Sequence, residues 1–374
     1  MIPITRPVIG EAEEAAVAEV LRSGWLSQGT RVQAFEAAIA DYVGAKHAIA
    51  TSSCTTALHL ALIAAGVQPG DEVVCPSFSF VATANAIHHA GATPVFVDID
   101  PRTYNVDVAK REAAITPRTR AIMPVDQVGL AADIPAVTEI ARRHNLAVVE
   151  DAAPALGATL PAGRIGSLAD FTCFSFHPRK SITTGEGGVI TTDNDDAAAR
   201  LRVLRSHGAS TSDLARHHSN PLDFEEYREL GYNYRLTDLQ AAVGVVQVGR
   251  LESILTERRR LAARYDLLLA NAPAVSTPFE PVGYRHTYQS YCIRLAAAAQ
   301  RPTVMSALAA KGIASRRGVM ATHLEPLYRD RYPALVLPET EAAAAETLLL
   351  PLFAGMTEPE QDLVVETLLR TLPG

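Results

Sequence analysis

The sequence predicts an α/β fold in which a mostly parallel sheet lies between helices. From about residue 47 onward, short β-branched runs alternate with longer amphipathic runs, the pattern of parallel strands joined by helices. The run LAVVEDAA at 146–153 passes directly from apolar residues to two carboxylates. Strand ends of this kind face the ligand crevice of open α/β sheets. Because 374 residues exceed the usual size of one compact core, we expect two domains.

The first block of elements extends to about residue 208. Its strand candidates are short and β-branched, whereas its helix candidates carry apolar residues at helical spacing. Strands are expected at 71–77, 93–100, 120–128, 146–153, 170–176 and 187–193. Helices are expected at 82–92, 134–145 and 197–208.

A polar, aromatic-poor stretch at 210–231 separates this block from the next helix. Long loops of this kind in compact domains are often functional. A long helical pattern then starts near Thr237 and continues to about residue 272. It is expected to link a large domain, residues 1–250, to a smaller C-terminal α+β domain, residues 251–374.

Within the C-terminal part, strands and helices alternate again. A strand is expected at 288–295, and helices are expected at 303–312 and 340–351. No internal repeat interrupts this pattern.

Composition and charge exclude several classes of function. Hydrophobic residues make up 48% of the chain and charged residues 20%, as in ordinary globular proteins. The formal net charge is −7 and Lys and Arg form no cluster, so nucleic acid is not an expected partner. The N-terminus lacks an apolar signal core and no stretch of about 18 residues is continuously apolar, so we expect a cytoplasmic protein without a membrane segment.

The four cysteines are scattered along the chain without the spacing of metal ligands. Three of them lie in apolar or strand-like contexts, where a buried free thiol is the common outcome. We therefore expect no metal and no disulfide. These cysteines are Cys54, Cys75, Cys173 and Cys292.

Lys180 is the first candidate for chemistry, because it follows a strand and precedes a turn of small residues instead of lying on a charged helix face. A lysine in a cleft at a strand end can have a lowered pKa and can serve as a Schiff-base nucleophile. A solvated surface lysine is the alternative that this residue alone leaves open.

Asp151 lies 29 residues before Lys180, a separation that one β-α-β passage would fill. A carboxylate beside the ring nitrogen of pyridoxal phosphate keeps that nitrogen protonated and makes the ring an electron sink. Two unit charges about 4 Å apart at an effective dielectric near 20 attract each other by ~4 kcal/mol, or about three pKa units. A helix cap by Asp151 or its neighbour Glu150 is the alternative.

A third segment, residues 52–62, runs from hydroxyl side chains directly into an apolar helix. A helix N-terminus with free N–H groups and hydroxyls can bind phosphate. Capping explains one hydroxyl, but the hydroxyls here are more than one cap needs. They belong to Thr51, Ser52, Ser53, Thr55 and Thr56.

Taken together and in this order, these segments resemble the DegT/DnrJ/EryC1/StrS family of pyridoxal-phosphate-dependent sugar aminotransferases. The resemblance covers nearly the whole chain, and it implies fold type I, the aspartate aminotransferase-like fold. Each motif is weak alone, but as a set they are specific. They are found at 23–53, 70–87, 91–100, 148–158, 174–188 and 231–242.

The resemblance implies a role for individual residues. Lys180 matches the Schiff-base lysine and Asp151 the partner of the ring nitrogen. Phe80 matches the aromatic residue that stacks on the pyridine ring, although without the resemblance a core phenylalanine would be expected.

The resemblance also implies which residues contact the phosphate. Thr55, preceded by Cys54, and Ser175 match the residues that reach the phosphate. Asn233 matches an asparagine that a neighbouring subunit lends to it, so the resemblance implies a homodimer with shared sites.

Several positions depart from the commonest family pattern. Cys54 stands where glycine usually precedes the phosphate threonine, and Pro154 replaces a frequent glutamine. The tripeptide 126–128 replaces a His-x-Tyr pattern, and Gln289 falls where a Trp-His pair is often seen. The last two changes are expected to affect substrate choice instead of cofactor binding.

The segment around His323 resembles the family segment that closes over the sugar, with a surface or packing histidine as the alternative. Arg316 and Arg317 are candidates for binding a diphosphate in bidentate fashion, or they are solvated charges.

The function that the resemblance implies is amino transfer from glutamate, or glutamine, to a nucleotide-linked 3- or 4-keto deoxysugar in amino-sugar biosynthesis. Pyridoxal 5′-phosphate would be the cofactor, with the pyridoxamine form as intermediate. The alternatives are an aminocyclitol (keto-inositol) aminotransferase, another fold-type I reaction on amino acids, and a non-catalytic regulatory protein that binds the cofactor. A family dehydratase is disfavoured because Lys180 is a lysine where that enzyme has histidine.

Overall fold

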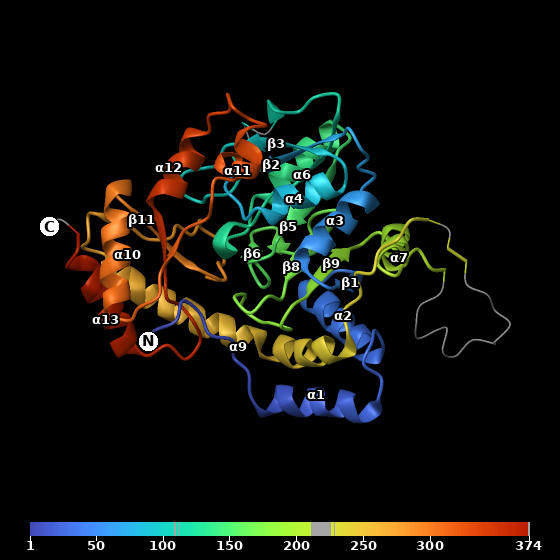
Figure 1. Ribbon diagram of the computed structural model, residues 1–374, viewed down its shortest axis with the longest axis horizontal. Coiled ribbons are helices and arrows are strands. Elements are labelled where there is room, and N and C mark those ends of the chain that lie inside the picture. Colours follow the sequence, from blue (N-terminus) through green and yellow to red (C-terminus); the bar gives the residue numbers. More distant parts are fainter. Residues whose placement is uncertain (108–109, 111, 211–225, 228, 373–374) are drawn as a thin grey trace.

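The computed structural model describes residues 1–107, 110, 112–210, 226–227 and 229–372 (Figure 1). Most of the predicted long excursion at 210–231 lies outside these residues. In the described part, no helix is both long and apolar enough to cross a lipid bilayer.

A seven-stranded sheet forms the centre of the larger part of the molecule. Its order is β1-β9-β8-β5-β4-β2-β3, and only β9 runs against the other six strands. The α/β fold with a mostly parallel sheet is therefore confirmed. The strands are β1 (His47–Thr51), β2 (Glu72–Pro76), β3 (Thr93–Val97), β4 (Thr119–Ile122), β5 (Ala147–Asp151), β8 (Phe171–Ser175) and β9 (Gly188–Thr192).

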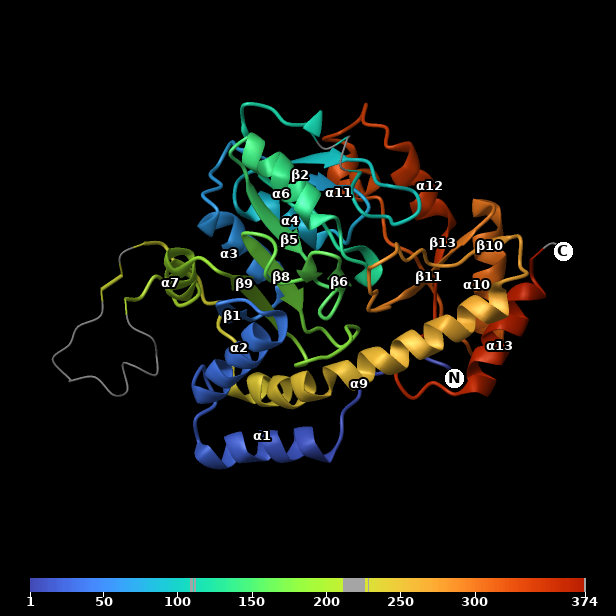
Figure 2. The ribbon, with the colours of Figure 1, turned by 180° about the vertical axis from the view of Figure 1, so that it is seen from behind.

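Helices cover both faces of this sheet, as Figures 1 and 2 show from opposite sides. One face packs against α3 (Cys54–Ala64), α4 (Ala82–His89) and α7 (Asp195–Leu204). The other face packs against α2 (Thr30–Val43), α6 (Ile134–Arg143) and the first part of α9 (Asp238–Leu269). Successive side chains of a strand point to opposite faces of the sheet, and here apolar side chains lie on both faces. Each face therefore has its own core.

Helix α9 links the two parts of the chain. It begins at the N-cap Thr237, whose hydroxyl accepts from the Gln240 N–H, and it passes residue 250 without a break. Helix α1 (Glu11–Ser23) packs along the first half of α9, and the last turns of α9 enter the C-terminal core (Figure 1). The domain boundary near residue 250 remains a prediction.

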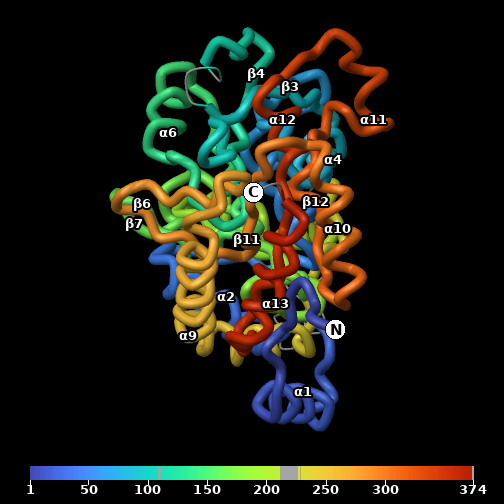
Figure 3. Tube along the Cα trace, turned by 90° about the vertical axis from the view of Figure 1, so that its left-hand side faces the viewer, coloured from blue at the N-terminus to red at the C-terminus, as the bar shows by residue number. Residues whose placement is uncertain are grey.

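The C-terminal part is built on a four-stranded antiparallel sheet of order β10-β11-β13-β12. Ile2 pairs with Ile313, which brings the N-terminus against this part (Figure 3). Its strands are β10 (Val275–Ser276), β11 (Tyr291–Leu295), β12 (Arg316–Arg317) and β13 (Thr347–Leu350). Its helices are α10 (Arg301–Ala310), α11 (Pro326–Arg329), α12 (Pro338–Glu346) and α13 (Glu358–Leu369).

The helix predicted over 340–351 is wrong in its second half. Helix α12 ends at Glu346, and residues 347–350 form β13 between β11 and β12. The run TLLL is buried in the centre of this sheet, so tertiary pairing overrides the helical pattern of the preceding alanines.

Short elements complete the chain. They are β6 (Thr159–Leu160), β7 (Gly163–Arg164), η1 (Gln127–Gly129), η2 (Ala298–Gln300) and η3 (Thr322–Leu324). The four cysteines are buried free thiols. The described residues contain no group of three or more His, Cys, Asp or Glu side chains arranged as metal ligands.

Candidate active site

A cavity of about 830 Å³ opens where the carboxyl ends of the parallel strands meet the C-terminal part of the chain. Its walls come from both, as expected for a ligand site at the edge of an α/β sheet. Eight of the residues predicted from the sequence line it: Cys54, Thr55, Phe80, Asp151, Ser175, Lys180, Arg316 and Arg317.

The N-terminus of α3 forms one end of the cavity. Ser53 is its N-cap: its hydroxyl accepts from the Thr56 N–H at 3.2 Å, and the Thr56 hydroxyl accepts from the Ser53 N–H at 3.1 Å. The N–H groups of Cys54 and Thr55 find no acceptor within the described part of the chain. Together with the Thr55 hydroxyl they suit a phosphate group.

Gly188, the first residue of β9, lies against this helix start. A Cβ atom at Gly188 would come within 2.4 Å of the Ser53 carbonyl and 2.6 Å of the Cys54 nitrogen. Any side chain here would have to displace backbone. The glycine therefore allows β9 to pack closely against the turn at the start of α3.

Lys180 lies half-buried in the turn between β8 and β9 and lines the cavity. Its backbone N–H donates to the His177 carbonyl at 2.8 Å, which fixes the turn. Burial lowers the pKa of Lys180, while the charge of the neighbouring Asp151 acts in the opposite direction. Burial also raises the pKa of the Cys54 thiol well above its usual value, so this thiol is neutral beside the lysine.

Asp151 ends β5 and is buried at the floor of the cavity. Burial raises the pKa of its carboxyl, and the hydrogen bond from Thr83, the charge of Lys180 and the Ala153 N–H lower it. The Thr83 hydroxyl donates to Oδ2 at 2.7 Å, and Thr83 in turn is 2.6 Å from the Ser79 hydroxyl. These contacts orient the carboxylate into the site.

Phe80 is a large aromatic side chain that remains 59% exposed, and it lines the cavity. An aromatic face open to a cavity can stack on a planar ligand ring. Ser175, the last residue of β8, places its hydroxyl on the same cavity.

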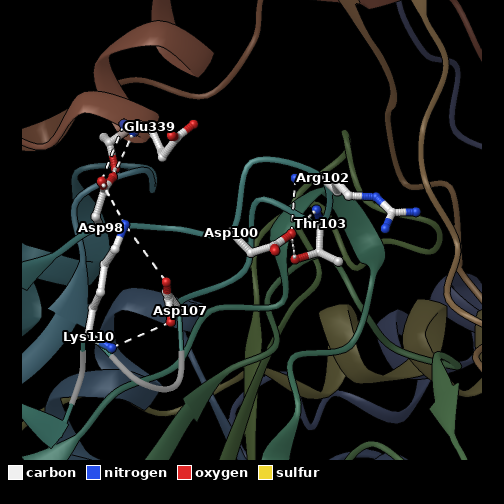
Figure 4. Close-up of polar contacts among 8 residues, drawn as sticks. Asp98, Asp100, Arg102, Thr103, Asp107, Lys110 and Glu339 are labelled. Carbon is white, nitrogen blue, oxygen red and sulfur yellow. Dashed lines mark hydrogen bonds and ion pairs between the residues drawn. The ribbon is translucent and has the colours of Figure 1, made fainter.

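Helix α12 forms a wall of the cavity and is anchored to the large sheet by Asp98 (Figure 4). The Asp98 carboxylate accepts from the Thr340 N–H at 2.8 Å and from the Glu339 N–H at 3.3 Å, and it pairs with Lys110 at 3.3 Å. Burial raises the pKa of Asp98, but the hydrogen bonds from Thr340 outweigh this and lower it. A carboxylate from the large sheet thus holds the first turn of α12.

Arg316 and Arg317 form β12, are exposed, and reach the cavity from the C-terminal part. Neither forms an ion pair with any residue that the structure describes. Two free guanidinium groups at a cavity suit an anionic ligand.

His323 and Asn233 do not line the cavity. His323 is buried, with Nδ1 2.7 Å from the Ser77 hydroxyl and Nε2 3.3 Å from a Glu341 oxygen. Both ring nitrogens are therefore engaged within the protein. Asn233 is exposed and forms a backbone bridge with Ser206, so its side chain is available to another molecule.

Thr83 and Ser79 line the cavity and support Asp151, but they were not singled out from the sequence. Gln289, expected from the sequence to affect substrate choice, also lines the cavity and donates from Nε2 to the Arg179 carbonyl at 2.7 Å, beside Lys180. Thr83 could have been found from its position, because it lies on the first turn of the helix that follows Phe80.

Comparisons with known proteins agree on the class of the protein. The model of the DegT/DnrJ/EryC1/StrS aminotransferase family matches residues 7–369. GDP-perosamine synthase of Caulobacter vibrioides is 44% identical over 371 residues, which cover 98% of this chain and 97% of that protein. Spore coat polysaccharide biosynthesis protein SpsC of Bacillus subtilis is 41% identical over 371 residues, covering 98% and 95%.

The solved structures similar to this chain include the putative sugar aminotransferase Spr1654 of Streptococcus pneumoniae. In its PMP-form, it superposes with a TM-score of 0.93 at 29% identity and covers 99% of both chains. Its PLP-form has also been solved, with a TM-score of 0.91. The fold-type I architecture is confirmed, and the chain belongs to the DegT/DnrJ/EryC1/StrS aminotransferase family.

Proposed function

We propose that this enzyme transfers an amino group from glutamate to a nucleotide-linked keto sugar, with pyridoxal 5′-phosphate as its cofactor. The observation that supports this most directly is the gathering of Lys180, Asp151 and the N-terminus of α3 around one cavity. The family and the named relatives support an amino sugar as the product.

The residues of the cavity fit this cofactor. The free N–H groups of Cys54 and Thr55 with the Thr55 hydroxyl would hold the phosphate. Phe80 would cover one face of the ring, and Asp151 would face its nitrogen. When bound, the cofactor supplies an electron sink and carries the amino group between donor and acceptor.

Lys180 has two tasks in this proposal. It would anchor the cofactor, and its free amine would remove the proton from the α-carbon of the donor. Only the neutral amine can accept that proton, so the lowered pKa of Lys180 favours this step near neutral pH. The buried position of the amine keeps the proton from exchanging freely with bulk water.

Asp151 would stabilise a positive charge at the ring nitrogen of the bound cofactor. The Thr83 hydroxyl and the Ala153 N–H both donate to its carboxylate, which favours the ionised form that burial opposes. Arg316 and Arg317 would bind the diphosphate of the acceptor at the mouth of the cavity.

We further propose that the enzyme is a homodimer in which Asn233 of each subunit completes the phosphate site of the other. The exposed position of Asn233 outside its own cavity supports this arrangement. An asparagine amide would add a neutral donor to the phosphate site.

The test is a single-turnover assay of the pyridoxamine form, prepared by reaction with glutamate. A panel of nucleotide-linked 3- and 4-keto sugars is added, and return of the aldehyde form is followed by absorbance. One nucleotide-linked sugar should restore it, and Lys180→Ala should not respond. If a keto-inositol restores the aldehyde form and no sugar nucleotide does, the acceptor is an aminocyclitol precursor.

A further inference from the structure

Two acidic side chains lie beneath the strand end that carries Asp151, and the proposed transfer reaction gives neither of them a role. Glu150 precedes Asp151 on β5. Asp126 lies shortly after the end of β4, the strand that neighbours β5 in the sheet. Both side chains are 0% exposed. They lie within hydrogen-bonding contact of each other.

Each carboxyl has one oxygen with a donor and one without. Asp126 Oδ1 accepts from the Ala132 N–H at 2.7 Å, and Glu150 Oε2 accepts from the Thr172 hydroxyl at 2.7 Å. Asp126 Oδ2 and Glu150 Oε1 are buried and have no donor within the described chain. Two ionised carboxylates would therefore face each other with an unsatisfied oxygen apiece, which is costly in a protein interior.

The surroundings offer no compensating positive charge. The titratable groups that face the pair from the packed elements are Asp151, Cys173 and Tyr284. Neither carboxyl forms an ion pair with a Lys, Arg or His that the structure describes. One proton can satisfy both unpaired oxygens, because a protonated carboxyl donates a hydrogen bond and an ionised carboxylate accepts it.

We propose that Asp126 and Glu150 share one proton, so that one carboxyl donates to the other and the pair positions the strand end bearing Asp151. Burial and the neighbouring carboxylate raise the pKa of Asp126 well above its usual value. Burial raises the pKa of Glu150 to about 7. Both shifts favour a proton on the pair, which titrates as a unit.

The position of the pair gives the shared proton a consequence for the active site. The Asp126 N–H donates to the Asp151 carbonyl at 3.1 Å, and the Asp151 N–H donates to the Pro124 carbonyl at 2.9 Å. The side-chain contact between Asp126 and Glu150 adds to these two backbone hydrogen bonds, which join Asp151 to the segment 124–126. Asp126 and Glu150 are positioning residues in this proposal, and their link to catalysis rests on the proposed role of Asp151.

Infrared spectroscopy of the cofactor-free protein tests the shared proton directly. A buried protonated carboxyl gives a carbonyl band apart from the amide and carboxylate bands. The wild-type protein should show it at neutral pH. Asp126→Asn and Glu150→Gln should each remove it, because an amide then supplies the donor and the remaining carboxyl ionises. Asp41→Asn, at an exposed carboxylate, should keep it. Absence of the band in the wild type, or its persistence in both amide variants, would overturn the proposal.

Cofactor titration tests the positioning role. Asp126→Asn keeps a donor toward Glu150 and should bind the cofactor about as tightly as the wild type. Asp126→Leu removes the donor and should weaken binding by roughly tenfold or more. Equal affinities in all three proteins would overturn the positioning role. If Asp151 is not the partner of the ring nitrogen, the infrared band should still be lost in the variants, but cofactor affinity should not change with it. The two failures can therefore be told apart.

Discussion

The Thr83 hydroxyl donates a 2.7 Å hydrogen bond to Asp151 Oδ2 at the floor of the cavity. The two residues lie on different elements, α4 and β5, and 68 residues separate them in the sequence. Burial raises the pKa of the Asp151 carboxyl, and this bond opposes that effect. The protonation of the proposed catalytic carboxylate is thus set by the packing of α4 on the sheet.

Thr83→Val should move the acid limb of the pH–activity profile to higher pH. The hydroxyl favours the ionised form of Asp151, so its loss raises the pKa of a carboxyl that burial has already raised. A hydrogen bond to a charged group contributes about 1.5–3 kcal/mol, which corresponds to a shift of about one to two pKa units. The profile of kcat/KM measures it. Thr83→Ser keeps the hydroxyl and should resemble the wild type; an unmoved acid limb in Thr83→Val would contradict the assignment.

Asp151→Asn should still bind the cofactor but lose most of its turnover. An amide cannot hold a positive charge on the ring nitrogen, and the lost attraction of ~4 kcal/mol corresponds to roughly a thousandfold in rate. Single-turnover rates with glutamate and absorbance spectra of the bound cofactor separate chemistry from binding. Transamination at the parent rate would mean that another carboxylate faces the ring.

Lys180 should be the only lysine that becomes modified when the cofactor-loaded enzyme is reduced with borohydride. The chain has four lysines, Lys46, Lys110, Lys180 and Lys311, and only Lys180 lines the cavity. Peptide mass spectrometry locates the pyridoxyl group. Lys180→Ala should abolish the adduct, whereas Lys311→Ala, at an exposed lysine, should retain it. An adduct on any of the other three would contradict the central assignment.

Six of the seven strands of the large sheet could be predicted from the sequence, because their periodicity is a local signal, whereas β1 (His47–Thr51) was not predicted. The family resemblance placed Asp151 and Lys180 in one site, and both line the cavity. The sequence does not show that Thr83 reaches Asp151, since that contact depends on how α4 packs. It also misplaced residues 347–350, whose strand exists only because β11 and β12 flank it. His323 was a candidate for the sugar, but its two ring nitrogens contact Ser77 and Glu341.

Gly188→Ala should weaken cofactor binding without unfolding the protein. The added Cβ would meet the Ser53 carbonyl at 2.4 Å, so the turn at the start of α3 must shift. Overpacking of this kind costs about 1–3 kcal/mol, equivalent to roughly 5- to 150-fold in affinity if the cost falls on the bound state. Fluorescence titration with the cofactor measures it. Gly249→Ala, where a Cβ would meet nothing within 4 Å, is the matched control. Unchanged affinity in Gly188→Ala would mean that this turn does not contact the phosphate.

Mixing two inactive variants should restore activity if the sites are shared between subunits. Lys180→Ala removes the anchor within its own cavity, and Asn233→Asp places a carboxylate where the proposed dimer needs a neutral donor to phosphate. In a heterodimer both lesions fall in one site, which leaves the other intact, so up to about half of the wild-type activity per heterodimer should return. Asn271→Asp, at another exposed asparagine, should be active by itself, which controls for the added charge. Subunit exchange is verified by native mass spectrometry of differently tagged chains. If exchange is complete and no activity returns, Asn233 serves its own subunit or does not contact the phosphate.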